Sequence, residues 1–405
     1  MTRRIASAEV IVCAPGRNFV TLKIVTEDGV IGWGDATLNG RELAVASYLR
    51  DHVAPLLIGR DAQRIEDTWQ YFAVGGYWRR GPVTMAAISA IDMALWDIAA
   101  KAAGVPLYQL LGGASRDRIR AYGHAMGRDV DELCASVRTL LDEGFTAVRI
   151  QTGVPGVETA YGVPEGDGRY EPASAGSRPV EETWDTSAYL RHIPQVFAEV
   201  RKRFGDDVEL LHDVHHRLTP IEAAQLGRSL EPYRPFWIED ATPAENPEGF
   251  RVIRAHTTAP LATGEVFNSV HDYRQLIGEQ LIDYSRSAVT HVGGVTALRR
   301  LAEFGELHGV RLAPHGPTDI SPIGLAATLH VDLAVHGFGI QEFMPRDPVT
   351  LRAFPGSFRF DRGHLHPGDA VGHGAGLDED FATGFAYQPA YLPVNRLKDG
   401  TLHDW

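Results

Sequence analysis

The spacing of apolar and polar positions divides the chain into parts with different secondary structure. Two strand-like segments, 5–14 and 19–37, come first, and Gly29 marks a hairpin turn within the second. The segments that follow have helical spacing and cover residues 41–57, 64–74 and 83–104. Strands followed by helices predict an α+β domain over residues 1–115.

From residue 116 onward, short apolar runs alternate with amphipathic stretches such as 130–144 and 294–309. The apolar runs are 118–125, 146–153, 208–216, 235–242, 260–267, 281–289, 310–317 and 338–344. Eight strand–helix units predict an α/β fold, a (β/α)8-type barrel over residues 116–345. The one long interruption, 153–182, is rich in Gly and Pro, and a loop of that length is usually functional or disordered. Residues 346–405 have few periodic segments, and we expect them to pack back on the first domain.

Composition narrows the class of protein. The formal net charge of −13 over 405 residues argues against nucleic acid or an anionic membrane as a partner. Two cysteines make no disulfide framework and favour a reduced, cytoplasmic location. We find neither a signal peptide nor a run of about 18 apolar residues, so we expect no membrane span.

Candidate chemistry gathers where the predicted strands end, which is where barrel enzymes hold their active sites. Each of the eight strands ends in ionisable or polar residues: His124; Arg149 and Gln151; Asp213 and His215; Glu239 and Asp240; Glu265; Arg286; His315; Glu342. A polar residue at one strand end is unremarkable, because it can simply be solvated. The same feature at all eight ends favours a single site at one mouth of the barrel.

In the segment LLHDVHHRLTP, residues 210–220, an apolar run that is typical of a strand is followed directly by an aspartate and two histidines. Side chains alternate along a strand, so Asp213 and His215 are expected on one face and His216 on the other, in a structural role. Taken alone, a solvated strand end explains this segment at least as well as an active site.

Three of the carboxylates follow one another at equal intervals. Asp213, Glu239 and Glu265 are each 26 residues apart and end three successive predicted strands. Carboxylates that converge on one point repel one another unless a cation neutralises them. Oxygen ligands without cysteine favour Mg²⁺ over Zn²⁺. We therefore predict a Mg²⁺ site made by these three residues, with three separately solvated loop acids as the alternative.

Several motifs together resemble a known family. The Asp-Glu-Glu trio behind an α+β capping domain resembles the enolase superfamily. The segments RIQTGVPG, LLHDVHHR, WIEDATPAEN, GEVFNS, TDISP and QEFM, with the terminal tryptophan, resemble its mannonate dehydratase group, which includes the starvation-sensing-protein-like members. The resemblance covers nearly the whole chain.

This resemblance implies which residues perform the chemistry. Many members of the superfamily carry Lys-x-Lys on the second barrel strand, whereas this chain has Arg149-Ile150-Gln151, which argues against racemase or muconate cycloisomerase chemistry. The base implied instead is Tyr161, with Arg149 lowering the pKa of its phenol from an ordinary value of about 10. His215 would act as the general acid that protonates the departing hydroxyl.

The resemblance also implies residues that bind an acid sugar. They come from the capping domain, the strand ends, a loop and the C-terminus: Asn39, His124, Arg286, His315, Asp319, Glu342 and Trp405. For Arg286, a buried ion pair with a neighbouring acid is the alternative to contact with the substrate carboxylate. We further expect a homo-oligomer.

Three hypotheses about function follow. The first is a Mg²⁺-dependent dehydratase that converts D-mannonate, or its C2 epimer D-gluconate, to 2-keto-3-deoxy-D-gluconate. The second is a family member with an intact metal site and no significant turnover of these acids, acting as a sensor or on another acid sugar. The third is a zinc amidohydrolase, which would need His-x-His at the end of the first barrel strand, where the chain reads GHAMG. The proline at position 317 is a feature that this chain shares with dehydratases that are slow or less selective. This resemblance leads us to expect a low catalytic efficiency.

Overall fold

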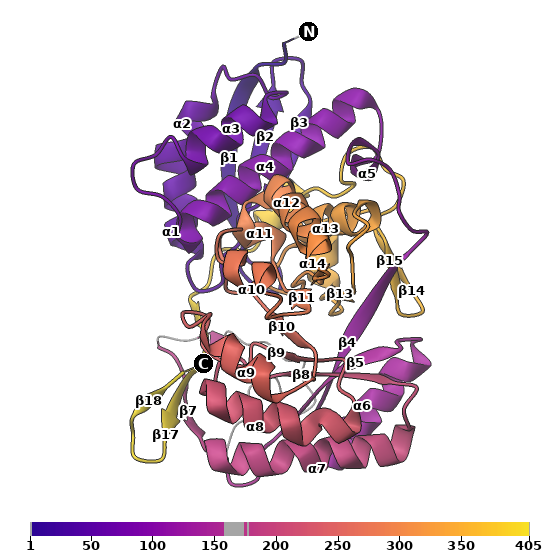
Figure 1. Ribbon diagram of the computed structural model, residues 1–405. Coiled ribbons are helices and arrows are strands. Elements are labelled where there is room, and N and C mark those ends of the chain that lie inside the picture. The colour runs from indigo at the N-terminus through magenta and orange to yellow at the C-terminus, as the bar shows by residue number, and fades with distance from the viewer. Residues whose placement is uncertain (1, 158–173, 176–177, 405) are drawn as a thin grey trace.

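The computed structural model describes residues 2–157, 174–175 and 178–404. Its N-terminal part is a capping domain built on an antiparallel sheet of β1 (Ile5–Cys13), β2 (Phe19–Thr26) and β3 (Ile31–Asp35). Gly29, with φ of 82°, makes the turn between β2 and β3. The helices that cover the sheet are α1 (Glu42–Tyr48), η1 (Leu49–Val53), α2 (Ala54–Leu57), α3 (Ile65–Ala73) and α4 (Pro82–Ala103) (Figure 1).

The long helix α4 is the core helix of the capping domain. Gly34 of β3 lets the strand approach it closely, because a Cβ at this position would collide with the carbonyl of Ala90. By length and composition alone α4 could cross a membrane, with a mean hydropathy of 1.5. However, 78% of its apolar window is buried inside the protein, which explains its composition as that of a core helix.

The second part is a closed barrel, as the apolar runs predict. Its parallel strands, in order around the barrel, are β4 (Ile119–Gly127), β5 (Ala147–Thr152), β8 (Glu209–Asp213), β9 (Trp237–Glu239), β10 (Leu261–Thr263), β11 (Tyr284–Ser285), β12 (Arg311–Leu312) and β13 (Gln341–Glu342). A parallel bridge between Leu312 and Phe338 joins β12 to the chain entering β13, and β13 pairs with β4. Each of the eight predicted runs overlaps one of these strands.

Helices surround the barrel, and apolar side chains fill it. The helices are α5 (Leu107–Leu110), α6 (Val130–Asp142), α7 (Thr186–Phe204), α8 (Pro220–Leu230), η2 (Glu231–Tyr233), α9 (Gly249–His256), α10 (Arg274–Gly278), α11 (Val289–Val292), α12 (Gly294–Leu307) and α13 (Pro322–Ala334). Inside, Tyr122, Leu211, Trp237 and Ile340 belong to one buried cluster. This layer closes the barrel beneath the strand ends, so it is a packed core rather than a pore.

The C-terminal segment returns to both parts. Its elements are α14 (Pro348–Ala353), β14 (Arg359–Asp361), β15 (His364–His366), α15 (Glu379–Ala382), β16 (Ala390–Tyr391), β17 (Val394–Leu397) and β18 (Leu402–His403). Phe354 and Ala382 pack with Phe19 and Trp33 of the capping domain. The predicted boundaries at residues 115 and 345 remain predictions, although this packing agrees with the expected return of the tail.

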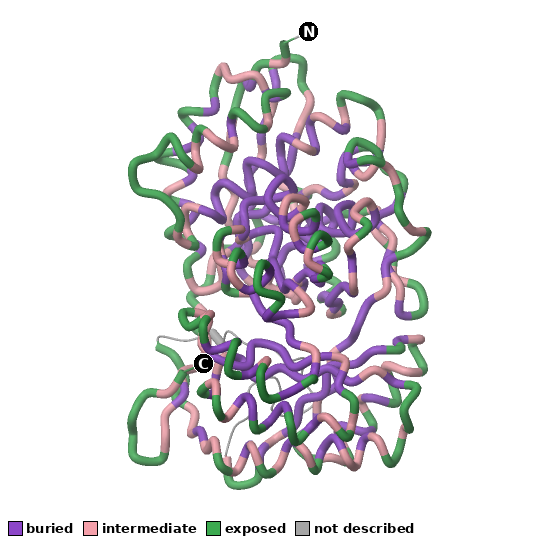
Figure 2. Tube along the Cα trace, in the orientation of Figure 1, coloured by how far each residue is buried: buried purple, intermediate pink, exposed green. Residues whose placement is uncertain are grey.

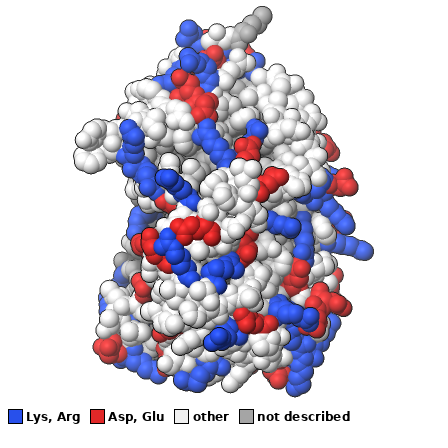
Figure 3. Space-filling view, viewed as in Figure 1, with Lys and Arg blue, Asp and Glu red and all other residues white. Residues whose placement is uncertain are grey.

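The tail also pairs with the segment that follows β5. β16 pairs with β6 (Ser174–Ala175), and β17 runs parallel to β7 (Glu181–Trp184). Figure 2 shows buried chain concentrated where the capping domain meets the barrel. Basic and acidic side chains are interspersed on the face shown in Figure 3.

Candidate active site

Three carboxylates converge at the carboxyl ends of adjacent barrel strands. Asp213 ends β8 and Glu239 ends β9, and the two residues are partners in the strand register. Glu265 follows β10. One oxygen from each of these carboxylates lies within 4.8 Å of the other two. The structure therefore brings together the trio that the regular spacing singles out.

The polar partners of the first two carboxylates hold them in fixed orientations. Trp237 Nε1 donates to Glu239 Oε2 at 3.0 Å, and Arg286 Nε donates to Glu239 Oε1 at 2.5 Å. Arg149 Nη1 donates to Asp213 Oδ2 at 2.6 Å. Because Asp213 and Glu239 are buried and held by their neighbours, the orientation of their oxygens is set before any ligand binds.

The electrostatics of this cluster favour a bound cation. Burial raises the pKa of Asp213 to about 6, against the opposing effect of Arg149. Burial, together with the neighbouring carboxylates, also raises the pKa values of Glu239 and Glu265 well above their usual range. A divalent cation would remove this penalty, and three carboxylate oxygens are hard ligands of the kind that Mg²⁺ prefers. The residues present thus fit Mg²⁺.

The two histidines after Asp213 lie in a turn, which corrects the expectation of a continuing strand. β8 ends at Asp213, and His215 and His216 have φ of 53° and 61°, in the left-handed region. Strand alternation therefore does not place His215. The turn does so instead: His215 N donates to Asp213 Oδ1, and His215 Nε2 lies 3.0 Å from Asp213 Oδ2. His216 Nδ1 lies 3.2 Å from the carbonyl of Thr242.

Arg149 lies on β5 with its guanidinium in the site. Its contact with Asp213 places a buried cation directly beside the carboxylate cluster. Burial, with Arg149 and Arg217 nearby, lowers the pKa of His215 well below its usual value. Tyr161, the expected base, lies outside the described residues, so its relation to Arg149 stays a prediction.

A second charged group lies on the opposite side of the barrel mouth. Arg286 is fully buried and donates through Nη2 to Glu342 Oε2 at 2.7 Å as well as to Glu239. His124 Nε2 lies 2.8 Å from Glu342 Oε1, and His315 Nε2 lies 3.4 Å from Glu265 Oε2. For Arg286, the structure shows the buried ion pair that was the alternative to contact with substrate. Its contact with a substrate carboxylate stays a prediction.

The surroundings of Glu342 and His124 leave the carboxyl group ionised and the imidazole neutral. Burial raises the pKa of Glu342, but Arg286, His315 and His124 outweigh it and hold this pKa well below the usual range. Burial and the charge of Arg149 lower the pKa of His124 to about 4, which leaves its imidazole neutral at pH 7. Glu342 is therefore a fixed anion that accepts a hydrogen bond from Arg286 and lies beside the imidazole of His124.

Two of the remaining expected substrate-binding residues lie in loops, and the third lies outside the described residues. Asn39 lies in the turn before α1, and the carbonyl of Thr37 in the same loop lies 3.2 Å from His291 Nε2 of the barrel. Asp319 lies in the loop after β12. Trp405 lies outside the described residues. The capping domain therefore contacts the barrel through the loop that carries Asn39.

Asp240 is a functional candidate that sequence reasoning noted but did not assign. It is fully buried, has φ of 40°, and accepts hydrogen bonds from Thr263 Oγ1 and the amide of Gly264. This carboxylate ties the end of β9 to the residues just before Glu265. Its place directly after Glu239 was the only signal in the sequence, and nothing there distinguishes a ligand from its support.

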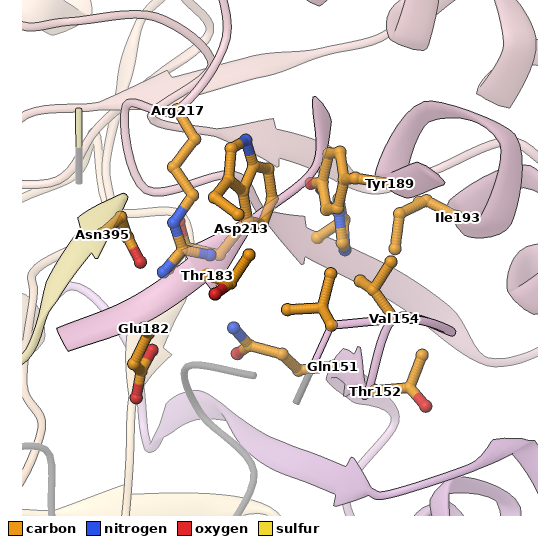
Figure 4. A pocket seen from close by; sticks show the side chains of 13 residues that line it. Gln151, Thr152, Val154, Glu182, Thr183, Tyr189, Ile193, Asp213, Arg217 and Asn395 are labelled. Atoms are coloured by element: carbon orange, nitrogen blue, oxygen red, sulfur yellow. Dashed lines mark hydrogen bonds between the residues drawn. The ribbon is translucent and has the colours of Figure 1, made fainter. Parts of the chain in front are cut away.

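A pocket beside Asp213 was not foreseen (Figure 4). It has an empty volume of about 450 Å³, including open solvent, and it lies between the ends of β5 and β8, helix α7 and the paired strands β7 and β17. Its lining includes Gln151, Thr152, Tyr189, Arg217 and Asn395. Arg217 stacks over the ring of Trp184. Long-range pairing of β7 with β17 creates this wall, and local sequence patterns give no signal for it.

Comparisons with known proteins agree with this architecture. Residues 132–381 match the family described as enolase C-terminal domain-like, and residues 11–112 match the N-terminal domain of mandelate racemase / muconate lactonizing enzyme. The chain is 59% identical to a D-galactonate dehydratase family member of Pseudarthrobacter chlorophenolicus (99% of this chain, 100% of the relative). It is also 59% identical, with the same coverage, to a D-mannonate dehydratase of Sphingomonas sp..

A solved structure is similar over its full length. An enolase from Pantoea ananatis with bound D-gluconate and magnesium superposes with a TM-score of 0.91. It shares 39% sequence identity with this chain, and the match covers 100% of both chains. The fold, the carboxylate cluster and these likenesses all point to one group of proteins.

Proposed function

The chain belongs to the enolase superfamily, among relatives that are sugar-acid dehydratases, and we propose that it removes water from a six-carbon acid sugar. The substrate would be D-mannonate or D-gluconate, and the product 2-keto-3-deoxy-D-gluconate. D-gluconate is a full candidate because it is bound with magnesium in the structure from Pantoea ananatis. The two acids differ only at C2, and the proposed reaction removes that stereocentre, so both give one product.

The observation that carries this proposal is the convergence of Asp213, Glu239 and Glu265 next to Arg149 and His215. The trio would hold Mg²⁺, and the two other side chains lie against the same carboxylate, Asp213. When bound, Mg²⁺ supplies the positive charge that stabilises the anion formed by loss of a proton next to a carboxylate. The acid sugar would thus be oriented by its carboxylate at this end of the barrel.

Each proton transfer is assigned to a residue of the chain. Tyr161 would remove the proton from C2, with Arg149 stabilising its phenolate. His215 would deliver a proton to the hydroxyl group leaving from C3, because a hydroxyl group departs more readily as water than as hydroxide. Asp213 orients the imidazole of His215 through the 3.0 Å contact to Nε2. The acid and the residue that assists the base would therefore both be held by one carboxylate, Asp213.

The remaining polar groups would recognise the hydroxyls of the sugar. His124, His315, Glu342 and Asp319 would serve as donors and acceptors, and Asn39 and Trp405 would also bind the sugar. A site that hydrogen-bonds a substrate hydroxyl rejects an analogue that lacks it, since the buried polar group is then left unpaired. Homo-oligomerisation and a cytoplasmic location are proposed alongside this activity.

A product assay tests the proposal. Purified protein with Mg²⁺ is incubated with a panel of six-carbon and five-carbon acid sugars, and 2-keto-acid product is measured. We expect product from D-mannonate, D-gluconate or both, and none after removal of divalent cations by a chelator. Glu239→Gln serves as the inactive control. The second hypothesis, a protein without significant turnover, is supported if these acids bind in the presence of Mg²⁺ but yield no product.

A further inference from the structure

The loop of residues 316–321, which joins β12 to α13, carries Pro317 and the predicted substrate ligand Asp319. Residues 316–320 belong to no strand or helix, although the amide of Ile320 donates to the carbonyl of Pro317 at 3.3 Å, and Ser321 is the N-cap residue of α13. A loop of this kind needs contacts from outside to hold one conformation. Its position therefore depends on the residues that surround it.

Arg346, which follows β13, holds this loop from beneath. Its Nη2 donates to the carbonyl of Ile320 at 2.7 Å and to that of Pro317 at 3.2 Å. Arg346 is 6% exposed, so these bonds form in a protected environment where a guanidinium–carbonyl contact is strong. One guanidinium thus bridges both ends of the turn that contains Asp319.

The capping domain holds the same loop from the other side. Arg17 Nη1 donates to Thr318 Oγ1 at 2.8 Å, and the amide of Ser321 donates to Asp35 Oδ2 at 2.7 Å. Asp35, fully buried at the end of β3, also contributes a negative charge close to Arg346. The loop is therefore fixed between Arg346 and the capping domain, and the contact of Ser321 with Asp35 joins residues 286 positions apart in sequence.

Asp319 itself contributes little to this fixation. Its Oδ1 is buried and has no hydrogen-bond partner among the described residues. An acceptor left unsatisfied in a protected place is costly unless a ligand or water meets it. Since its own loop is anchored by other residues, the side chain of Asp319 is available for an incoming donor.

We propose that Arg346 is a positioning residue: by bridging Pro317 and Ile320 it presents Asp319 to the hydroxyl groups of the acid sugar. This inference rests on the proposed function. Arginine is suited to the task because Nη2 carries two hydrogens at the end of a rigid planar group and can meet two carbonyls at once, whereas a lysine ammonium is a point charge on a flexible stem. Because a misplacement of about 1 Å can cost about a hundredfold in rate, the anchor should matter for catalysis without touching the substrate.

Two variants and a matched control test the anchor without any ligand. Arg346→Met removes both carbonyl contacts, and Arg346→Lys keeps the charge with poorer geometry. Arg352→Met is the control: Arg352 is exposed on the neighbouring α14 and stacks over Phe381. Hydrogen exchange is measured for a peptide spanning residues 316–321. We expect faster exchange in Arg346→Met, an intermediate rate in Arg346→Lys and the wild-type rate in the control. Unchanged exchange in Arg346→Met overturns the proposal.

A double-mutant cycle tests whether the anchor acts through Asp319. We expect Arg346→Met to lower kcat/KM for the acid sugar by about ten- to a hundredfold, with partial rescue in Arg346→Lys and Mg²⁺ affinity unchanged. In an Asp319→Asn background, Arg346→Met should cause little further loss, because the residue it positions is already disabled. Additive losses would show a general structural role and overturn the proposal.

The outcomes separate this inference from the proposed function. If the wild-type protein neither binds nor converts D-mannonate or D-gluconate, the proposed function fails, and the exchange measurement alone decides whether Arg346 anchors the loop. If the wild type is active and the cycle is additive, the proposed function stands and the inference about Arg346 fails.

Discussion

Arg149 Nη1 and His215 Nε2 approach the same oxygen of Asp213, at 2.6 Å and 3.0 Å. The residue expected to assist the base and the residue expected to act as the acid are therefore linked through one predicted metal ligand. Any change at Asp213 should disturb metal binding and both proton transfers together. The variants that separate these roles must therefore lie elsewhere in the site.

Glu239 offers the clearest test of the metal site. Glu239→Gln keeps the size and shape of the side chain, but it removes one of three negative charges that would face the cation and replaces an acceptor oxygen with a donor. We expect Mg²⁺ affinity, measured by calorimetry, to fall by about tenfold or more, and dehydratase activity to be lost. Glu303→Gln, on the exposed face of α12, is the control. Unchanged Mg²⁺ affinity in Glu239→Gln would remove Glu239 from the ligand set.

The division of labour between base and acid is tested by isotope exchange. In deuterated solvent, Tyr161→Phe should block exchange of the C2 proton of the acid sugar, since the phenol that removes it is gone. His215→Asn should retain some exchange while losing elimination of water, because it lacks only the acid. Proton NMR of recovered substrate and a keto-acid assay measure the two steps. Exchange retained in Tyr161→Phe and lost in His215→Asn would reverse the assignment.

The barrel and the cluster of three carboxylates could be predicted from the sequence because both depend on local, repeated patterns. Each apolar run overlaps a strand, and the interval of 26 residues marks the last residues of β8 and β9 and a residue just after β10. The prediction that strand alternation places His215 was wrong. His215 and His216 adopt left-handed backbone conformations, which a sequence signals through glycine and not through histidine. The wall formed by β7 and β17 and the anchor at Arg346 depend on contacts between distant segments, and these leave no local pattern.

The protonation of the carboxylate cluster predicts how stability responds to pH and Mg²⁺. Burial raises the pKa of Asp213 from its ordinary value of 3.8 to about 6, and Glu239 and Glu265 are raised as well. Above pH 4 the folded metal-free protein therefore binds more protons than the unfolded chain. Its free energy of unfolding should therefore fall as pH rises from about 4 through 6, because carboxyl groups that are protonated in the folded protein must ionise while buried.

Bound Mg²⁺ should reverse this trend, because it requires the ionised carboxylates. We expect the rise in Tm on adding Mg²⁺ to be larger at pH 8 than at pH 5. Thermal unfolding at both pH values, with and without Mg²⁺, measures it, and Glu239→Gln should show a much smaller rise at pH 8. An equal Mg²⁺-induced rise at both pH values would contradict the raised pKa values.

Pro317 predicts a low catalytic efficiency. Proline fixes φ near about −65° and has no amide donor, and it restricts the backbone of Gly316, whose amide donates to Glu342 Oε2 at 2.9 Å. This restriction falls next to His315, a predicted substrate ligand, so Pro317 would displace the imidazole of His315 rather than the turn that Arg346 holds. We expect kcat/KM on D-mannonate and on D-gluconate to lie below about 10⁴ M⁻¹s⁻¹. Pro317→Ala, which restores an amide and some freedom at this position, should raise kcat/KM on D-mannonate by about tenfold. Pro355→Ala, in the loop after α14, is the control for the loss of a proline elsewhere. Steady-state kinetics on both acids measures these values. A wild-type kcat/KM on D-mannonate at or above about 10⁴ M⁻¹s⁻¹ would show that Pro317 does not limit the catalytic efficiency of the enzyme.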